Sequence, residues 1–180
     1  QVLVPKDTPG LQLIRPLTTL GYDDAPLGHA EMVFDNVRVP LDNVLLGEGR
    51  GFEIAQGRLG PGRIHHCMRL IGAAQRSLEL ACKRVASRTT FGRTLSQHQS
   101  VREEIARSFC EIEMARLLVL KTCKKMDAVG AKGALDMIAA SKTTVPLMVQ
   151  NIIDRCMQMH GAGGLTADYC MAEAFNYARW

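Results

Sequence analysis

The pattern of hydrophobic and polar residues changes near residue 50. From Gly51 onward, apolar residues recur every three or four positions, which is the spacing of helices that bury one face. Four helices are predicted, the last beginning near Thr166, a residue type that often caps helices. Because long helices joined by short loops pack antiparallel, this pattern predicts an up-down bundle. The predicted helices cover 51–88, 97–129, 134–160 and 166–180.

Glycine and proline mark the breaks in this pattern. Gly60-Pro61-Gly62 predicts either two helices or one kinked helix, because a proline inside a helix removes a hydrogen bond and clashes with the preceding turn. Pro146 predicts a kink in the third helix. Gly130 and Gly133 end the second helix, and the glycine-rich run 161–164 ends the third.

Two of the predicted helices carry apolar stripes that we expect to face the core. In the second helix the stripe is Val101, Ile105, Phe109, Ile112, Leu120 and Cys123. In the third it is Leu135, Ile138, Val145, Val149, Ile152 and Cys156.

The first 50 residues have the punctuation of strands and turns, with prolines and glycines between short apolar runs. The runs are Val2–Val4, Leu11–Ile14, Met32–Phe34 and Val37–Val39, and the alternation over 36–39 predicts a strand with one buried face. These strands are too few for a stable antiparallel sheet, so we expect further strands upstream. The predicted fold is mainly α: residues 1–50 form the C-terminal part of a small antiparallel β-domain, and residues 51–180 form a truncated helical bundle domain.

Composition narrows the class of protein. The chain has 180 residues, of which 47% are hydrophobic, 22% charged and 5% aromatic, a balance that argues against disorder and against an all-β fold. No uncharged apolar stretch approaches the roughly 20 residues of a membrane span. A net charge of +4 does not indicate nucleic-acid binding and suits a phosphorylated small molecule equally well. Because the chain starts at Gln1 and stops inside a helical pattern at Trp180, we expect both ends to be cut from a longer protein.

The six cysteines are expected to be free thiols, which weakly indicates a reducing compartment. None forms a Cys-x-x-Cys motif, and most occupy apolar helical positions where a thiol packs as a small hydrophobe. His65 and His66 are adjacent and point in different directions on a helix, so no set of convergent metal ligands is apparent.

Three places are unusual for a plain bundle. Arg88-Thr89-Thr90-Phe91-Gly92, followed by His98-Gln99, puts a phosphate-binding type of cation and an aromatic ring at a helix end. Gln158–Gly164 combines small residues that allow close approach to the backbone, and Gly62-Arg63 places a cation beside the proline of the first helix. Local physics alone favours plainer roles for all three, namely a helix-end arginine, a helix connection and a surface arginine.

The order of the motifs adds a family resemblance. Over essentially the whole chain, the motifs resemble the C-terminal half of the acyl-CoA dehydrogenase family, and 58–69 is most similar to the group of family members ten and eleven. They are Lys6–Gly10, Phe34–Pro40, Asn43–Phe52, Arg63, Arg88–Gly92, His98-Gln99 and Gln158–Gly164.

The resemblance implies a four-helix domain of the acyl-CoA dehydrogenase type and an FAD cofactor. It implies that Arg88 contacts the FAD pyrophosphate with Thr90 and Phe91 beside it, and that His98 and Gln99 lie along the same cofactor. Gln158, Gly161 and Ala162 would approach its adenosine half, although many relatives have glycine in place of Ala162. Arg63 would lie near the acyl-CoA thioester.

The reaction that the resemblance implies is dehydrogenation of an acyl-CoA to a trans-2-enoyl-CoA in fatty-acid β-oxidation. The catalytic carboxylate is expected just beyond Trp180, and the alternative position in some relatives is Gly62 here, so this segment alone is expected to be inactive. Implied partners are a second copy in a homodimer or homotetramer, which completes the cofactor site, and an electron-transfer flavoprotein. The implied location is intracellular, either mitochondrial or peroxisomal.

Two other functions remain open at this point. A non-catalytic helical oligomerisation module would use the same bundle without flavin, and an acyl-CoA oxidase on the same scaffold would pass electrons to oxygen.

Overall fold

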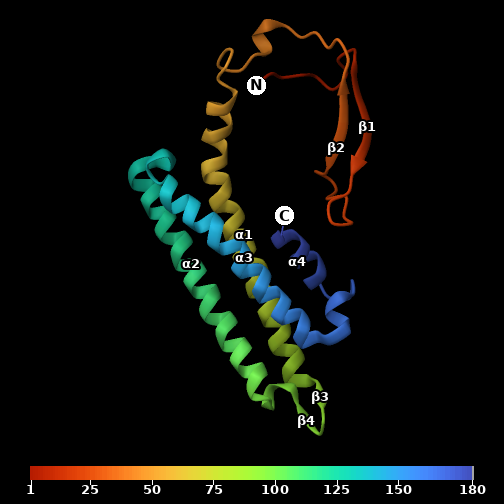
Figure 1. Ribbon diagram of the computed structural model, residues 1–180, viewed down its shortest axis with the longest axis vertical. Coiled ribbons are helices and arrows are strands. Elements are labelled where there is room, and N and C mark those ends of the chain that lie inside the picture. The colour runs from red at the N-terminus through yellow and green to blue at the C-terminus, as the bar shows by residue number, and fades with distance from the viewer. Residues whose placement is uncertain (180) are drawn as a thin grey trace. The chain divides into compact units, whose positions relative to one another are not determined.

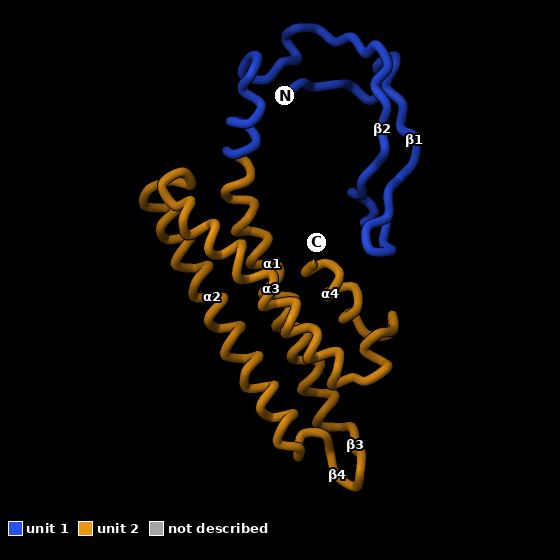
Figure 2. Tube along the Cα trace, in the orientation of Figure 1, with its two compact units in different colours: residues 1–57 blue, residues 58–180 orange. Residues whose placement is uncertain are grey.

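The computed structural model describes residues 1–179, and the chain divides into two compact units, residues 1–57 and the residues from Arg58 onward (Figure 2). The element order is two strands, a long helix, a small hairpin and three further helices (Figure 1). None of the helices within residues 1–179 is long and apolar enough to cross a membrane.

The first unit is built on an antiparallel pair, β1 (Leu11–Leu17) and β2 (His29–Phe34). Arg15 and Glu31 are register partners and form an ion pair of 2.8 Å across the two strands. No residue of 1–57, all of which are described, is buried, and the sheet leaves apolar side chains such as Phe34 exposed. The expected small antiparallel sheet is therefore confirmed, but it has no core of its own.

Two strand predictions in this unit are wrong. Residues 36–39 form no strand, although Val37 and Val39 are half-buried and Arg38 is exposed, as the alternation indicates. The run at 2–4 contributes only an isolated bridge between Val2 and Val44. Neither segment has a partner strand along its length, so the alternation indicates side-chain burial without a ladder of backbone hydrogen bonds.

The second unit contains most of α1 (Gly51–Ser87), followed by β3 (Thr89–Thr90), β4 (Arg93–Thr94), α2 (Gln99–Gly133), α3 (Leu135–His160) and α4 (Met171–Arg179). Short 3-10 turns lie at Leu95–Gln97 and Gly161–Leu165, and a third, Leu41–Asn43, belongs to the first unit. The mainly helical fold predicted from the sequence is confirmed.

α1 is a single helix through Gly60-Pro61-Gly62, so the two-helix alternative is wrong. Gly60 is buried, and a Cβ at this position would lie 3.3 Å from the Cβ of Ala131 and 4.0 Å from Cδ1 of Ile138. Pro61 is exposed, where its ring disturbs no neighbouring helix. Because Gly60 has no side chain, α1 can pack closely against Ala131 and Ile138 here, and this packing favours an unbroken helix. α3 likewise continues through Pro146.

Polar contacts between α2 and α3 fix an antiparallel pairing. Thr122 and Ser141 share a buried hydrogen bond of 2.9 Å between their hydroxyl oxygens, and Lys125 pairs with Asp136 at 2.7 Å. Near the opposite end of the pair, Arg155 of α3 reaches the carboxylates of α2. The start of α2 therefore lies beside the end of α3.

The apolar stripe predicted for α2 is partly wrong. Phe109 and Leu120 are 55% and 50% exposed, and Leu135 of α3 is 48% exposed. Ile112 is buried as predicted, and the buried residues of α2 recur at alternating spacings of four and three: Ser108, Ile112, Ala115, Val119 and Thr122. Small side chains on this face let the helices approach closely, and Thr122 satisfies its hydroxyl by donating to the Leu118 carbonyl at 2.8 Å. Most of the predicted α3 stripe is confirmed as buried.

The last helix begins later than predicted. α4 starts at Met171, and Thr166 does not cap it. The Thr166 hydroxyl instead donates to the Gly163 carbonyl at 2.8 Å and accepts from the backbone N–H of Asp168 at 3.3 Å, which closes a local turn. Gly130 breaks α2 as expected, with a non-helical φ of 74°, three residues before the end of that helix.

Candidate functional site

The hairpin between α1 and α2 presents an aromatic ring to solvent. Thr90 pairs with Arg93, and the two residues between them, Phe91 and Gly92, have positive φ values of 52° and 78°. Positive φ at both central positions is typical of a type I′ hairpin turn, a geometry that glycine adopts freely and phenylalanine only at a cost. The Phe91 side chain is 98% exposed, so packing does not compensate for the strain. The strained backbone and the exposed ring together make Phe91 a candidate contact residue.

Arg88 lies directly after the last residue of α1, at the base of this hairpin. Its backbone N–H donates to the Arg84 carbonyl at 2.9 Å, and its own carbonyl accepts from Leu95 at 2.9 Å. Its side chain is exposed and makes no hydrogen bond or ion pair with the described residues. The guanidinium is thus held by a fixed backbone while its donors remain open to an anion.

His98 immediately precedes α2 and has one unsatisfied ring nitrogen. Arg93 lies 3.2 Å from Nδ1, and since a guanidinium only donates, Nδ1 is the acceptor. The ring hydrogen is then on Nε2, which is buried and without a partner among the described residues. The next residue, Gln99, is exposed and donates to Glu103 at 2.9 Å.

The end of α3 forms a tight glycine-rich turn. Gly161 has φ 64° and ψ −146°, a conformation that favours glycine, and its N–H closes the helix on the Gln158 carbonyl. Gln158, Gly161 and Ala162 are all exposed. Gly164 is buried, and a Cβ there would lie only 2.6 Å from the Met157 carbonyl oxygen. Backbone at this turn is therefore open on one side and tightly packed on the other.

The sequence reasoning did not single out His160, which fixes this turn from the inside. Its side chain is 4% exposed, and Nδ1 donates to the Cys156 carbonyl at 2.8 Å. The ring meets Tyr169 edge-on at 4.6 Å between centroids, and Nε2 has no partner among residues 1–179. A histidine before a glycine run was the available signal, but nothing in the sequence showed that it would be buried.

The antiparallel helices bring the two exposed segments to the same end of the bundle (Figure 1). Arg155 of α3 contacts Glu104 of α2 at 3.5 Å and also pairs with Glu111. Glu104 lies close to the start of α2, and Arg155 lies close to the end of α3. The hairpin residues 88–99 and the turn residues 158–162 therefore lie at the same end of the bundle, as a shared site requires.

Arg63 is not part of this end of the bundle. It lies in α1 about 25 residues before Arg88, which at a rise of 1.5 Å per residue is roughly 37 Å along the helix. Its side chain is half-buried and has no hydrogen bond or ion pair with the described residues. The pKa of nearby His66 is lowered by burial and by the cations of Arg69 and Lys142, with a smaller contribution from His65.

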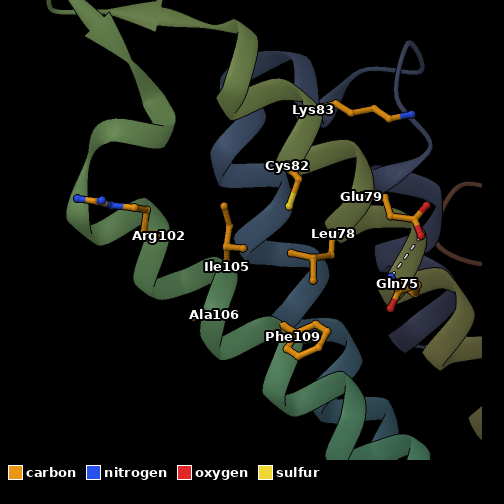
Figure 3. Close-up of a pocket in the computed structure, with 9 residues that line it drawn as sticks. All are labelled: Gln75, Leu78, Glu79, Cys82, Lys83, Arg102, Ile105, Ala106 and Phe109. Carbon is orange, nitrogen blue, oxygen red and sulfur yellow. Dashed lines mark hydrogen bonds between the residues drawn. The ribbon is translucent and has the colours of Figure 1, made fainter.

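A groove of about 680 Å³ lies between α1 and α2 (Figure 3). Leu78 and Cys82 of α1 face Ile105 and Phe109 of α2 across it. The remaining lining residues are Gln75, Glu79, Lys83, Arg102 and Ala106. None of the site residues predicted from the sequence lines this groove.

All six cysteines are free, as predicted, and the buried ones are poor nucleophiles. Burial raises the pKa of Cys156 to about 12 and raises the pKa values of Cys67 and Cys82 as well. A thiolate is the reactive form of cysteine, so these side chains act as packing residues near neutral pH.

Comparison with known proteins agrees with this architecture. The family model "Acyl-CoA dehydrogenase, C-terminal domain" matches residues 49–180. Acyl-CoA dehydrogenase family member 10 of Mus musculus is 56% identical over 178 residues, which is 99% of this chain and 17% of the relative. Family member 11 of Gallus gallus is 52% identical over 179 residues, 99% of this chain and 23% of the relative.

Among solved structures, a putative acyl-CoA dehydrogenase from Mycobacterium abscessus is 50% identical, with a TM-score of 0.95 over 99% of this chain and 44% of its own. The chain therefore spans less than half the length of each of these proteins. The resemblance to family members ten and eleven is confirmed. With the helical fold, the sequence identities and a family match over most of its length in agreement, this chain belongs to the acyl-CoA dehydrogenase family.

Proposed function

We propose that this chain is the C-terminal part of an FAD-dependent acyl-CoA dehydrogenase that converts acyl-CoA thioesters to trans-2-enoyl-CoA in fatty-acid β-oxidation. The observation that carries the proposal is the exposed hairpin with Arg88 and Phe91, at the same end of the bundle as the exposed turn at Gly161. An unpaired cation, a solvent-exposed ring and accessible backbone groups form a donor set suited to a dinucleotide that carries a pyrophosphate and flat ring systems.

The residues present fit FAD, and each has a separate role in holding it. Arg88 would donate to the pyrophosphate, and the ring of Phe91 would cover a flat face of the cofactor, with Thr90 beside it. The buried Nε2–H of His98 is a donor without an acceptor among the described residues, and Gln99 adds an exposed amide that also donates to Glu103. When bound, FAD supplies the acceptor for the hydride that leaves the β-carbon of the acyl chain.

The turn at the end of α3 would hold the adenosine half. Gly161 and Ala162 leave the backbone accessible, and Gln158 adds an exposed amide at the same place. Any shift of this turn is opposed from within, because Gly164 is packed against the Met157 carbonyl and His160 is bonded to Cys156. The methyl group of Ala162 is small enough to keep this approach open.

Arg63 would act at the substrate end rather than at the pyrophosphate. Its separation of roughly 37 Å along α1 from Arg88 fits a homodimer or homotetramer in which the hairpin of one copy completes the cofactor site of its neighbour. Arg63 would then orient the acyl-CoA thioester, while the α-proton is removed by a carboxylate. Neither Gly62 nor any other residue identified in this segment supplies that base, which is expected beyond Trp180; Trp180 itself lies outside the described residues.

Flavin content and substrate bleaching test this proposal. The full-length protein should copurify with flavin absorbance and lose it on addition of a suitable acyl-CoA under anaerobic conditions. A folded full-length protein without flavin would instead support a non-catalytic oligomerisation module, for which the exposed apolar face of α2 argues. Reoxidation by oxygen would indicate an acyl-CoA oxidase, whereas reoxidation by an electron-transfer flavoprotein would support the dehydrogenase.

The 180-residue segment alone should give no enoyl-CoA even with added FAD. Residence in mitochondria or peroxisomes is part of the same proposal.

A further inference from the structure

The turn at Gly161–Gly164 has too few side-chain atoms to fix its own conformation. It consists of three glycines and one alanine, so no side chain longer than a methyl group holds its backbone. Glycine leaves more backbone conformations open than any other residue, and ordering each residue costs free energy. A backbone that receives a ligand binds it more tightly when it is already ordered. Contacts from residues outside the turn must therefore supply that order.

Tyr169 supplies such a contact from the segment that follows the turn. Within the stretch 165–170, Tyr169 alone is half-buried, and the other residues are exposed. Its side chain packs against the buried core of the bundle. Its hydroxyl makes no hydrogen bond with residues 1–179, so the contribution of Tyr169 within this part of the chain comes from its ring.

The ring of Tyr169 contacts one residue within the turn and the residue that precedes it. A Cβ at Gly163 would lie 3.2 Å from Cε2 and 3.7 Å from Cδ2 of Tyr169, so the backbone of this glycine lies directly against the ring. The ring also meets His160, with 4.6 Å between the ring centroids and an angle of 63° between the planes. This edge-to-face arrangement is favourable for aromatic pairs. Tyr169 therefore joins the end of α3 to the turn.

Both contacts of Tyr169 are themselves held in place. His160 is 4% exposed and its Nδ1 donates to the Cys156 carbonyl at 2.8 Å, which fixes its ring to the last turn of α3. The Gly163 carbonyl accepts hydrogen bonds from the Thr166 N–H at 3.1 Å and from the Thr166 hydroxyl at 2.8 Å. The chain that leads to Tyr169 thus folds back onto the same glycine that the ring covers.

We propose that Tyr169 is a positioning residue for the cofactor, whose ring holds the backbone of the turn in the conformation that receives the adenosine half of FAD. The inference rests on the proposed function, which assigns this turn to FAD. In this role Tyr169 acts through Gly163 and His160 and needs no contact with the cofactor. The ring is required and the hydroxyl is not.

Flavin titration of the full-length protein, stripped of its cofactor, tests this role. Tyr169→Leu keeps an apolar side chain but removes the flat ring, and it should weaken FAD binding by about tenfold, roughly the cost of ordering one backbone residue. Tyr169→Phe keeps the ring and should bind FAD like the parent. Equal affinities of the parent and Tyr169→Leu, or an equal loss in Tyr169→Phe, would overturn the proposal.

Val145→Ala is the control that separates positioning from a general loss of stability. Val145 is fully buried on α3, about four helical turns before His160, so its truncation destabilises the bundle away from the cofactor turn. This variant should bind FAD like the parent although it melts earlier. A loss of affinity as large as that of Tyr169→Leu would show that overall stability controls binding, which contradicts a positioning role.

Hydrogen exchange follows the order of the turn without any flavin. In the flavin-free full-length protein, Tyr169→Leu should speed exchange of the backbone N–H groups of 161–164 by a larger factor than those in the middle of α3. Tyr169→Phe should leave the turn as protected as in the parent. If the turn exchanges at the same rate in all three proteins, the ring does not order it and the proposal is wrong.

The two measurements distinguish this inference from the proposed function. A parent protein that binds no FAD would refute the dehydrogenase proposal, and hydrogen exchange would still show whether Tyr169 orders the turn. A protein that binds FAD, and binds it as tightly after Tyr169→Leu, would refute only the positioning role.

Discussion

The middle of the helical bundle and the hairpin at its end contain opposite kinds of residue. In the bundle, apolar side chains such as Ile152 and Val145 have no exposed surface, and the polar pair Thr122 and Ser141 is satisfied internally. In the hairpin, Arg88 has no side-chain partner among residues 1–179, and Phe91 is exposed in a strained backbone conformation. Stability is therefore supplied by the bundle, whereas the end of the bundle is arranged for binding at some cost to stability.

The largest expected effect comes from the bundle. Ile152→Ala should lower the free energy of unfolding by about 2–5 kcal/mol, because it removes a fully buried side chain and leaves a cavity. Urea unfolding followed by circular dichroism measures this change. Leu147→Ala on the same helix is the control, since a 62% exposed leucine should cost within about 0.5 kcal/mol. Similar losses in both variants would mean that α3 is not packed as described.

The turn at the end of α3 should be sensitive on its packed side. Gly164→Ala should destabilise the protein by about 1–3 kcal/mol, because the new methyl group would lie 2.6 Å from the Met157 carbonyl oxygen. Gly72→Ala is the matched control: Gly72 is helical and exposed, with open space around a Cβ, so this change should stabilise by about 0.5–1 kcal/mol. Thermal melts of both variants give the comparison, and a harmless Gly164→Ala would show that the turn is loose.

In the hairpin, a substitution that raises stability should at the same time weaken FAD binding. Phe91→Gly should raise the stability of the flavin-free protein by about 1 kcal/mol relative to Phe91→Ala, because glycine adopts the positive φ without strain. Both variants lose the ring, so both should bind FAD more weakly than the parent. Differential melting and flavin titration test the two halves. Equal stability of the glycine and alanine variants would show that the turn is unstrained.

The sequence predicted the helices well and their faces less well. Long apolar periodicity is a strong signal for a helix, and the stripe of α3 up to Cys156 is largely buried as expected. In α2 the larger apolar residues suggested a face that only partly overlaps the buried one and shares Ile112 with it, because Ser108, Ala115 and Thr122 are too small or polar to indicate burial from hydropathy alone. The four-and-three spacing of these residues would have identified the inner face.

The sequence also indicated only some of the residues that form the candidate site. Motif order pointed to Arg88 and Phe91, and both lie exposed at one end of the bundle. The burial of His160 and the close packing of Gly164 depend on contacts made by folding and had no local signal. The strain at Phe91 was likewise hidden, since a phenylalanine before a glycine reads as an ordinary turn until its φ is known.

The central claim is that Arg88 holds the cofactor and does not hold the fold. The most direct measurement is a flavin titration of the full-length protein with Arg88→Ala, alongside melting of its flavin-free form. Arg107→Ala is the control, because Arg107 is an exposed arginine of α2 whose ion pair with Glu104 lies on the surface. We predict that Arg88→Ala weakens FAD binding by about 1.5–3 kcal/mol, the value of a hydrogen bond to a charged group. The free energy of unfolding of its flavin-free form should stay within about 1 kcal/mol of the parent. Arg107→Ala should change neither quantity. Unchanged FAD affinity in Arg88→Ala, or a large loss of stability in its flavin-free form, would contradict the account.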